Sequence, residues 1–235
     1  MKKKRNSHLV FTLLSFFVPF IIYLITMAPR SSFWDCGEFI ACSVTLGVPH
    51  PPGSPLYLLL GNVFSYLPSF SDIGARVNLI SPIVSAFSVM FLYLIIVQLL
   101  NRLNKNDIDK KKLIEYCAFI GALTFAVTDS QWFNAVESEV YSLSTFFTSI
   151  VVWLIIKWDE NSFHNNSIKY IILISYMMGL AAGIHLLNLL AIPCIIFIIY
   201  YNKISSTALN KIDIKKLFLD IIYVAFLSLL IFTVI

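Results

Sequence analysis

Charged side chains are scarce in this chain: Asp, Glu, Lys and Arg together make up 13% of its 235 residues. Soluble domains carry about 25% charged residues, so the shortage argues against a soluble protein. Hydrophobic residues make up 58% of the sequence, and many fall in runs near the length of about 20 residues that crosses a bilayer. In lipid, the backbone N–H and C=O groups must hydrogen-bond to one another, and runs of this length do so by forming helices. The composition predicts an all-α, polytopic transmembrane helical bundle with the lipid bilayer, and no nucleic acid, as a partner.

Cysteine is also sparse, with four residues that form neither a CxxC pair nor a spacing typical of a metal site. Cys36 and Cys42 lie six residues apart, so on a helix their side chains would point away from each other. We therefore expect no disulfide here and no metal centre built from cysteines.

The apolar runs predict seven spans, separated by short polar turns and one long loop. The spans cover approximately residues 9–28, 77–100, 113–128, 140–158, 168–184, 187–201 and 217–235. The first run is too long for a signal peptide and is followed by Pro29, so we expect an uncleaved span. The last run ends without a polar residue, which predicts that the chain is the N-terminal part of a longer protein.

The long loop covers residues 30–75 and contains two short apolar pieces, residues 39–48 and 56–67. Each is too short to cross a bilayer. We expect two interfacial helices joined by a proline-rich turn, and a compact polar loop over residues 129–139.

Small residues indicate where helices pack closely. Ser81, Ser85 and Ser88 fall on one face of the second span, and Gly179 and Gly183 form a GxxxG pair. The apolar stretch 168–201 would be about 50 Å long as one helix, so we divide it at the tight turn near His185.

The cations predict the orientation. With the N-terminus in the cytoplasm, all but two of the 17 Lys and Arg residues lie on the cytoplasmic side, as the positive-inside rule requires. The exceptions are Arg30 and Arg76. The same topology places seven further ionisable residues on the outer face, which predicts a site there: Asp35, Glu38, His50, Asp129, Glu137, Glu139 and His185.

The residues around position 35 suggest catalysis or cation binding. Asp35 and Glu38 would share one face of a helical turn. Such a pair can hold one raised pKa and act as a general base, or it can ligate a hard divalent cation. Trp34 suits stacking on a sugar ring or a place in an interfacial aromatic belt. The prolines that follow His50 hold its backbone rigidly, which suits a hydrogen bond to a phosphate or hydroxyl as well as a plain turn.

The other candidates are substrate-binding residues. Arg30 and Arg76 could contact a lipid phosphate, or could instead extend to headgroups. Glu137 and Glu139 lie where a polar loop enters the fourth span, and ionisable groups at such depth are usually functional. His185 suits packing better than ligand binding.

Two motifs resemble the signature of a known family. Residues 33–39 read FWDCGEF and residues 46–55 read LGVPHPPGSP. Residues 131–143 and 179–187 resemble a second acidic motif and a later Gly-rich segment of the same family. It contains bacterial membrane proteins related to animal protein O-mannosyltransferases of plexin-type domains, and it is similar to the GT-C glycosyltransferases.

The resemblance implies a multi-span enzyme that moves a sugar, such as mannose, from a polyprenyl-phosphate donor to a hydroxyl of a protein or glycan acceptor. It implies that Asp35 is catalytic with Glu38 beside it, and that Glu139 belongs to a second acidic site. A divalent metal ion, if used, would bind Asp35 and Glu139. The expected location is the bacterial inner membrane, with the site on the outer face. A transporter or flippase, and a scaffold subunit, are the alternatives.

Overall fold

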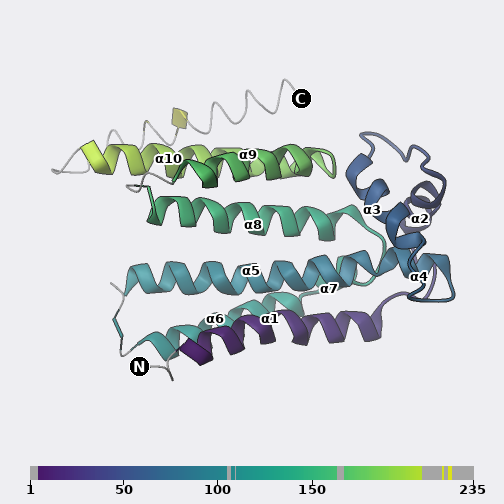
Figure 1. The fold of residues 1–235 in the computed structure, drawn as a ribbon, viewed down its shortest axis with the longest axis horizontal. Coiled ribbons are helices and arrows are strands. Elements are labelled where there is room, and N and C mark those ends of the chain that lie inside the picture. Colours follow the sequence, from purple (N-terminus) through teal and green to yellow (C-terminus); the bar gives the residue numbers. More distant parts are fainter. Residues whose placement is uncertain are drawn as a thin grey trace.

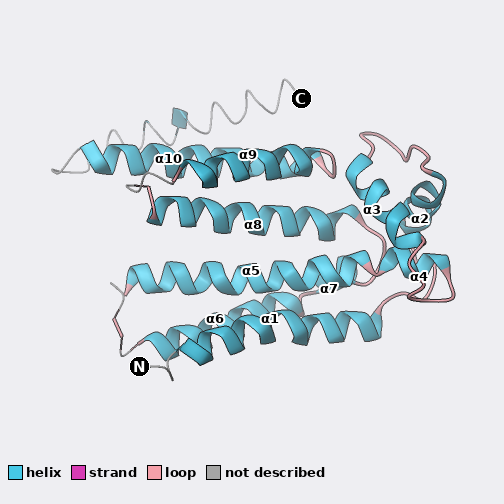
Figure 2. Ribbon diagram, viewed as in Figure 1, coloured by secondary structure: helices cyan, strands magenta, loops and turns pink. Residues whose placement is uncertain are grey.

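The structure is a computed structural model that describes residues 5–104, 107–108, 110–162, 167–207, 219 and 222–223. The described part consists of helices and the loops between them and contains no strand (Figure 2), which confirms the predicted all-α class. Its elements are α1 (Arg5–Thr26), α2 (Cys36–Thr45), α3 (Pro55–Ser65), α4 (Ile73–Asn78), α5 (Ile80–Leu103), α6 (Lys111–Ala126), α7 (Asp129–Ala135), α8 (Val140–Glu160), α9 (Ile168–Ala182), the 3-10 helix η2 (Leu186–Leu190) and α10 (Ala191–Thr207).

The long helices lie side by side, and the short helices α2, α3 and α4 gather at one end of them, away from the N-terminus (Figure 1). Helix α5 is central and packs against α1, α6 and α8, while α9 and α10 pack on α8. In the described residues, three helical segments are long and apolar enough to cross a membrane: Ser7–Thr26, Ile73–Leu103 and Val140–Glu160. Helices α6 and α7, bent by 68°, could form a fourth. The chain is therefore a membrane protein.

Small polar residues let the central helices approach. Ser81, Ser85 and Ser88 are all buried in α5, and Ser142 of α8 donates a hydrogen bond to Ser81 over 3.1 Å. The predicted small-residue face is therefore a packed one. At the GxxxG pair only one glycine meets another helix: a Cβ at Gly183 would contact α3, whereas one at Gly179 would meet no atom within 4 Å.

Helices occupy six of the seven predicted spans, but how many of them cross the bilayer stays a prediction. Helices α2 and α3 lie at the two short apolar pieces of the first loop. The predicted span 217–235 lies almost entirely outside the described residues.

The expected polar loop over residues 129–139 is wrong in its first half, because residues Asp129–Ala135 form helix α7. Asp129 in the first turn favours a helix, since its charge complements the helix dipole. The Trp132 indole also anchors the helix, donating a hydrogen bond to Thr26 over 3.1 Å.

Candidate functional site

Three segments that are distant in the sequence meet at the end of the bundle that carries α2, α3 and α4 (Figure 1). They are the first loop, the residues between α7 and α8, and the turn between α9 and η2. Because successive long helices run in opposite directions, every second connection returns to this end.

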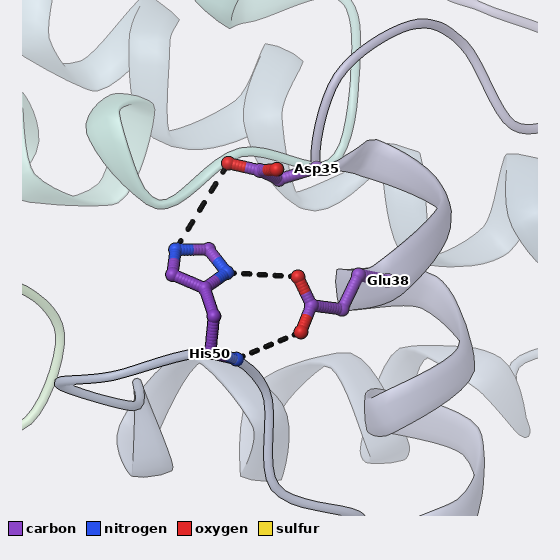
Figure 3. A group of neighbouring side chains, drawn as sticks. All are labelled: Asp35, Glu38 and His50. Carbon is purple, nitrogen blue, oxygen red and sulfur yellow. Dashed lines mark hydrogen bonds and ion pairs between the residues drawn. The ribbon is translucent and has the colours of Figure 1, made fainter.

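His50 lies between the two carboxylates of the first motif (Figure 3). One oxygen of Glu38 accepts the His50 backbone N–H at 2.7 Å, and the other lies 2.8 Å from His50 Nδ1. His50 Nε2 lies 4.0 Å from an oxygen of Asp35. The Glu38 hydrogen bond raises the pKa of His50, and the same interaction lowers the pKa of Glu38. Because Nδ1 of His50 is bound to Glu38, the other ring nitrogen, Nε2, faces Asp35.

The local sequence explains this arrangement. Asp35 is the N-cap residue of α2, and its side chain makes no capping hydrogen bond, so its carboxylate stays available. Glu38 lies in the first turn of α2, where a negative charge is favoured by the helix dipole. Helix α2 ends at Thr45, and its C-cap residue Leu46 adopts the left-handed conformation. The chain then turns back through the prolines, and Pro55 starts α3 at the position where proline is best tolerated.

Trp34 precedes the catalytic candidate in a conformation that large residues rarely adopt, with φ of 56°. Its side chain is 84% exposed. Strained backbone held in place is often found at functional sites. An exposed indole beside Asp35 suits both sugar stacking and an interfacial belt.

Glu139 is the buried carboxylate of the site. It is 5% exposed at the N-cap of α8, and burial raises its pKa to about 7, with further contributions from the negative charges of Asp35 and Glu137. Glu137 is also buried, and one of its oxygens has no hydrogen-bond partner among the described residues. From the sequence, the Asp35–Glu38 pair could hold one raised pKa or bind a cation. The structure lowers the pKa of Glu38 through its hydrogen bonds with His50, and burial raises the pKa of Glu139.

Asn78, at the end of α4, connects the two acidic segments and was missed in the sequence. Its fully buried amide donates hydrogen bonds to the carbonyl groups of Ala28 and Arg30, over 2.8 and 2.9 Å. Its oxygen accepts from Ser138 at 2.5 Å and from the Cys36 thiol at 3.7 Å. Asn78 therefore links Cys36, the residue after Asp35, to Ser138, the residue before Glu139. The one signal in the sequence is an amide at the apolar start of a span.

The first loop is also attached to the turn after α9. Ser54 donates a side-chain hydrogen bond to the carbonyl of Ile184 over 2.8 Å. The backbone N–H of Leu56 donates to the carbonyl of Gly183 over 2.9 Å. We call these two bonds the loop latch.

The remaining predicted residues lie outside the Asp35–Glu38–His50 cluster. Arg30 forms an exposed ion pair with Asp72 at 3.2 Å. The Arg76 guanidinium donates to three backbone carbonyl groups, one at the end of α3 and two in the loop before α4. His185 is the N-cap of η2, where its Nδ1 accepts the Leu187 N–H at 3.1 Å. The roles of Arg30, Arg76 and His185 in substrate binding stay predictions.

Asp35, Glu38 and His50 could together hold a metal ion, because one ligand atom from each lies within 4.8 Å of the others. Two carboxylates and an imidazole suit a hard or borderline divalent cation. The sequence suggested Asp35 with Glu139 as ligands. That pairing stays a prediction. Among the described residues, the group whose ligand atoms lie close enough for one ion is Asp35 with Glu38 and His50, and the negative charge of Asp35 contributes to the raised pKa of Glu139.

Comparison with known proteins assigns the chain to a family. The model of the family described as the protein O-mannosyl-transferase TMEM260 N-terminal domain matches residues 35–208. The match begins at Asp35 and covers every site residue predicted from the sequence except Arg30 and Trp34. No solved structure matches the chain.

Two curated proteins are similar over most of this chain. Protein O-mannosyl-transferase tmem260 of Dictyostelium discoideum is 25% identical over 194 residues, which cover 77% of this chain and 22% of that protein. Protein O-mannosyl-transferase TMEM260 of Mus musculus is 24% identical over 189 residues, which cover 80% of this chain and 25% of that protein. The chain thus spans about a quarter of the length of these relatives. The family match, over well more than half of the chain, confirms the resemblance seen in the motifs: the chain belongs to the TMEM260 N-terminal domain family of protein O-mannosyl-transferases.

Proposed function

We propose that this chain is the N-terminal membrane part of a GT-C-type glycosyltransferase. It would move mannose from a polyprenyl-phosphate donor to a hydroxyl group of a protein or glycan acceptor on the non-cytoplasmic face. The observation that carries the proposal is the meeting of Asp35, Glu38 and His50 with the buried Glu139 at one end of the bundle. The names of the two relatives support mannose as the sugar.

In the proposed reaction, Asp35 accepts the proton of the acceptor hydroxyl as its oxygen attacks the anomeric carbon. The bond from that carbon to the polyprenyl phosphate breaks, and the lipid phosphate leaves with the electron pair. A single displacement of this kind inverts the configuration of the sugar carbon. Asp35 suits the part of base because its side chain is 54% exposed and free of capping bonds.

The neighbours of Asp35 have separate parts in this scheme. Glu38 fixes His50 through one hydrogen bond to its backbone N–H and one to its ring Nδ1, and it favours the protonated ring. Protonated His50 would then stabilise the negative charge of the leaving phosphate. A divalent cation held by the same cluster would supply that stabilisation when bound. Glu139, whose pKa is about 7, would be a second proton acceptor near Asp35.

Transport is the competing function, and the placement of the acidic group argues against it. A transporter holds its polar site near the bilayer midplane, at interrupted helices. Here the cluster belongs to α2 and the turn before α3, beyond the end of the long helices (Figure 1).

The test is transfer of labelled mannose from polyprenyl-phosphate mannose by the full-length protein. Asp35→Asn should retain the fold and lose at least 100-fold in rate, as expected for the loss of a general base. Asp129→Asn is the matched control, because Asp129 is exposed on the same predicted face and lies outside the cluster. Wild-type transfer by Asp35→Asn at normal expression would refute the assignment.

A further inference from the structure

A cavity of about 600 Å³ lies at the opposite end of the bundle, where α1 and α6 begin and α5 and α8 end. This is the end that carries the N-terminus (Figure 1). Its volume is within the range of sites that bind small ligands. Nothing in the proposed transfer reaction uses it.

The charged lining of the cavity is mainly cationic. Arg102, Lys111 and Lys157 line it, against one lining carboxylate, Glu160. Arg102 is held in place by ion pairs with Asp159 and Glu160 and by a hydrogen bond to a backbone carbonyl. Lys157 pairs with Glu160 at 3.1 Å.

Lys111 differs from the other two cations. It has no ion pair with any residue that the structure describes. It also starts α6, at a helix end where positive charge is not favoured by the dipole. One cation of the cavity therefore makes no ion pair with the described residues.

Two buried polar atoms of the cavity wall also lack partners. Neither the Gln98 side-chain oxygen nor the Trp153 indole nitrogen makes a hydrogen bond to any described residue. His8 lines the cavity too, and one of its ring nitrogens is occupied by the Tyr93 hydroxyl at 3.0 Å. Buried polar atoms without partners are uncommon in proteins and call for an explanation such as a bound ion.

We propose that this cavity binds the anionic phosphate of a small headgroup. Phosphate oxygens would accept from Lys111 and from the indole N–H after a small adjustment of the wall, and a hydroxyl of the headgroup would donate to Gln98. The surroundings point to a lipid as the source. Leu9, Val10 and Leu113 are exposed beside the cavity on α1 and α6, and basic pockets between membrane helices are known sites for anionic lipid headgroups.

The test measures binding to the full-length protein in neutral detergent, from the shift in its thermal unfolding midpoint. The probes are dioleoyl phosphatidylglycerol, glycerol 3-phosphate and dioleoylglycerol. Stabilisation by the phospholipid alone supports a lipid headgroup, and stabilisation by glycerol 3-phosphate as well supports a free phosphate ester. Stabilisation by neither phosphate probe, or equal stabilisation by dioleoylglycerol, overturns the proposal.

Substitutions in the wall of the cavity test whether the probe binds there. Lys111→Gln and Trp153→Phe should each weaken binding about tenfold, the size expected for loss of one charge-assisted or buried hydrogen bond. Trp153→Phe keeps a ring in the wall and removes only the N–H. Lys112→Gln is the matched control, because Lys112 is the next residue of the same helix and does not line the cavity. An equal loss in Lys112→Gln would show diffuse charge attraction and overturn the site.

Discussion

Replacing Asn78 by alanine should separate the two acidic segments of the site. The change removes the acceptor of Ser138 and of Cys36, both fully buried, and the donors of two backbone carbonyl groups. A buried group left without its partner costs about 1–3 kcal/mol. Ser138 bears that cost in full, the thiol bears less as a weak donor, and the carbonyls of Ala28 and Arg30 can recover water because both residues are partly or fully exposed. The free energy of unfolding should fall by about 3 kcal/mol.

The assay is denaturant unfolding of the full-length protein in detergent, together with mannose transfer at a temperature where the variant stays folded. Transfer should also fall, since Asn78 sets the position of the segments that carry Asp35 and Glu139. Asn134→Ala is the control, because Asn134 makes one hydrogen bond within its own helix, to the Ser130 carbonyl, on the surface. A loss of stability below about 1 kcal/mol, with unchanged transfer, would refute the role given to Asn78.

Four further substitutions test other parts of the structure. The folded pKa of Glu139 is about 7, above its ordinary value of 4.5, so the stability that its protonated form contributes is lost as the pH rises from 4.5 through 7. The free energy of unfolding of Glu139→Gln should therefore rise relative to that of the wild type between pH 5 and pH 8, as measured by denaturant unfolding. A difference that stays constant with pH would contradict the raised pKa. Glu38→Gln should lower the pKa of His50 toward its ordinary value, because the Glu38 hydrogen bond is what raises it; NMR titration of the ring measures this, and an unchanged pKa would disprove the pairing. Gly61→Ala should destabilise the protein by about 1–3 kcal/mol, since its Cβ would collide with the facing serine of α2. Gly179→Ala, where nothing lies within 4 Å of the new Cβ, should stabilise it by about 0.5–1 kcal/mol; thermal unfolding compares the two, and equal effects would contradict the packing of α3 on α2.

The length of each apolar run was enough to locate the long helices, because a membrane helix needs little beyond about 20 apolar residues. The motifs at residues 33–39 and 46–55 were likewise enough to identify Asp35, Glu38 and His50 as candidates. Their pairing was not predictable, because the turn between residues 46 and 55 decides which carboxylate His50 meets. The raised pKa of Glu139 depends on burial by segments distant in the sequence, and run length does not report such burial.

The hydrogen bonds of Asn78 also could not be predicted from the sequence. A single amide among apolar neighbours marks a buried hydrogen-bond group, but its four partners come from three separate segments. Only the packing of α2, α4, the end of α1 and the start of α8 brings them together. The left-handed conformation of Trp34 was also hidden, because nothing in the residue type favours it.

The loop latch has a consequence for the order in which the protein is completed during synthesis. Ser54 and Ile184 are 130 residues apart, and at about 5–20 residues per second the ribosome needs roughly 6–26 s to make the intervening chain. The segment that carries Asp35 and His50 therefore waits for the turn after α9 before its own hydrogen bonds are complete. A nascent chain arrested shortly before residue 184 should hold this loop in a form that protease cleaves, and release of the arrest should protect it.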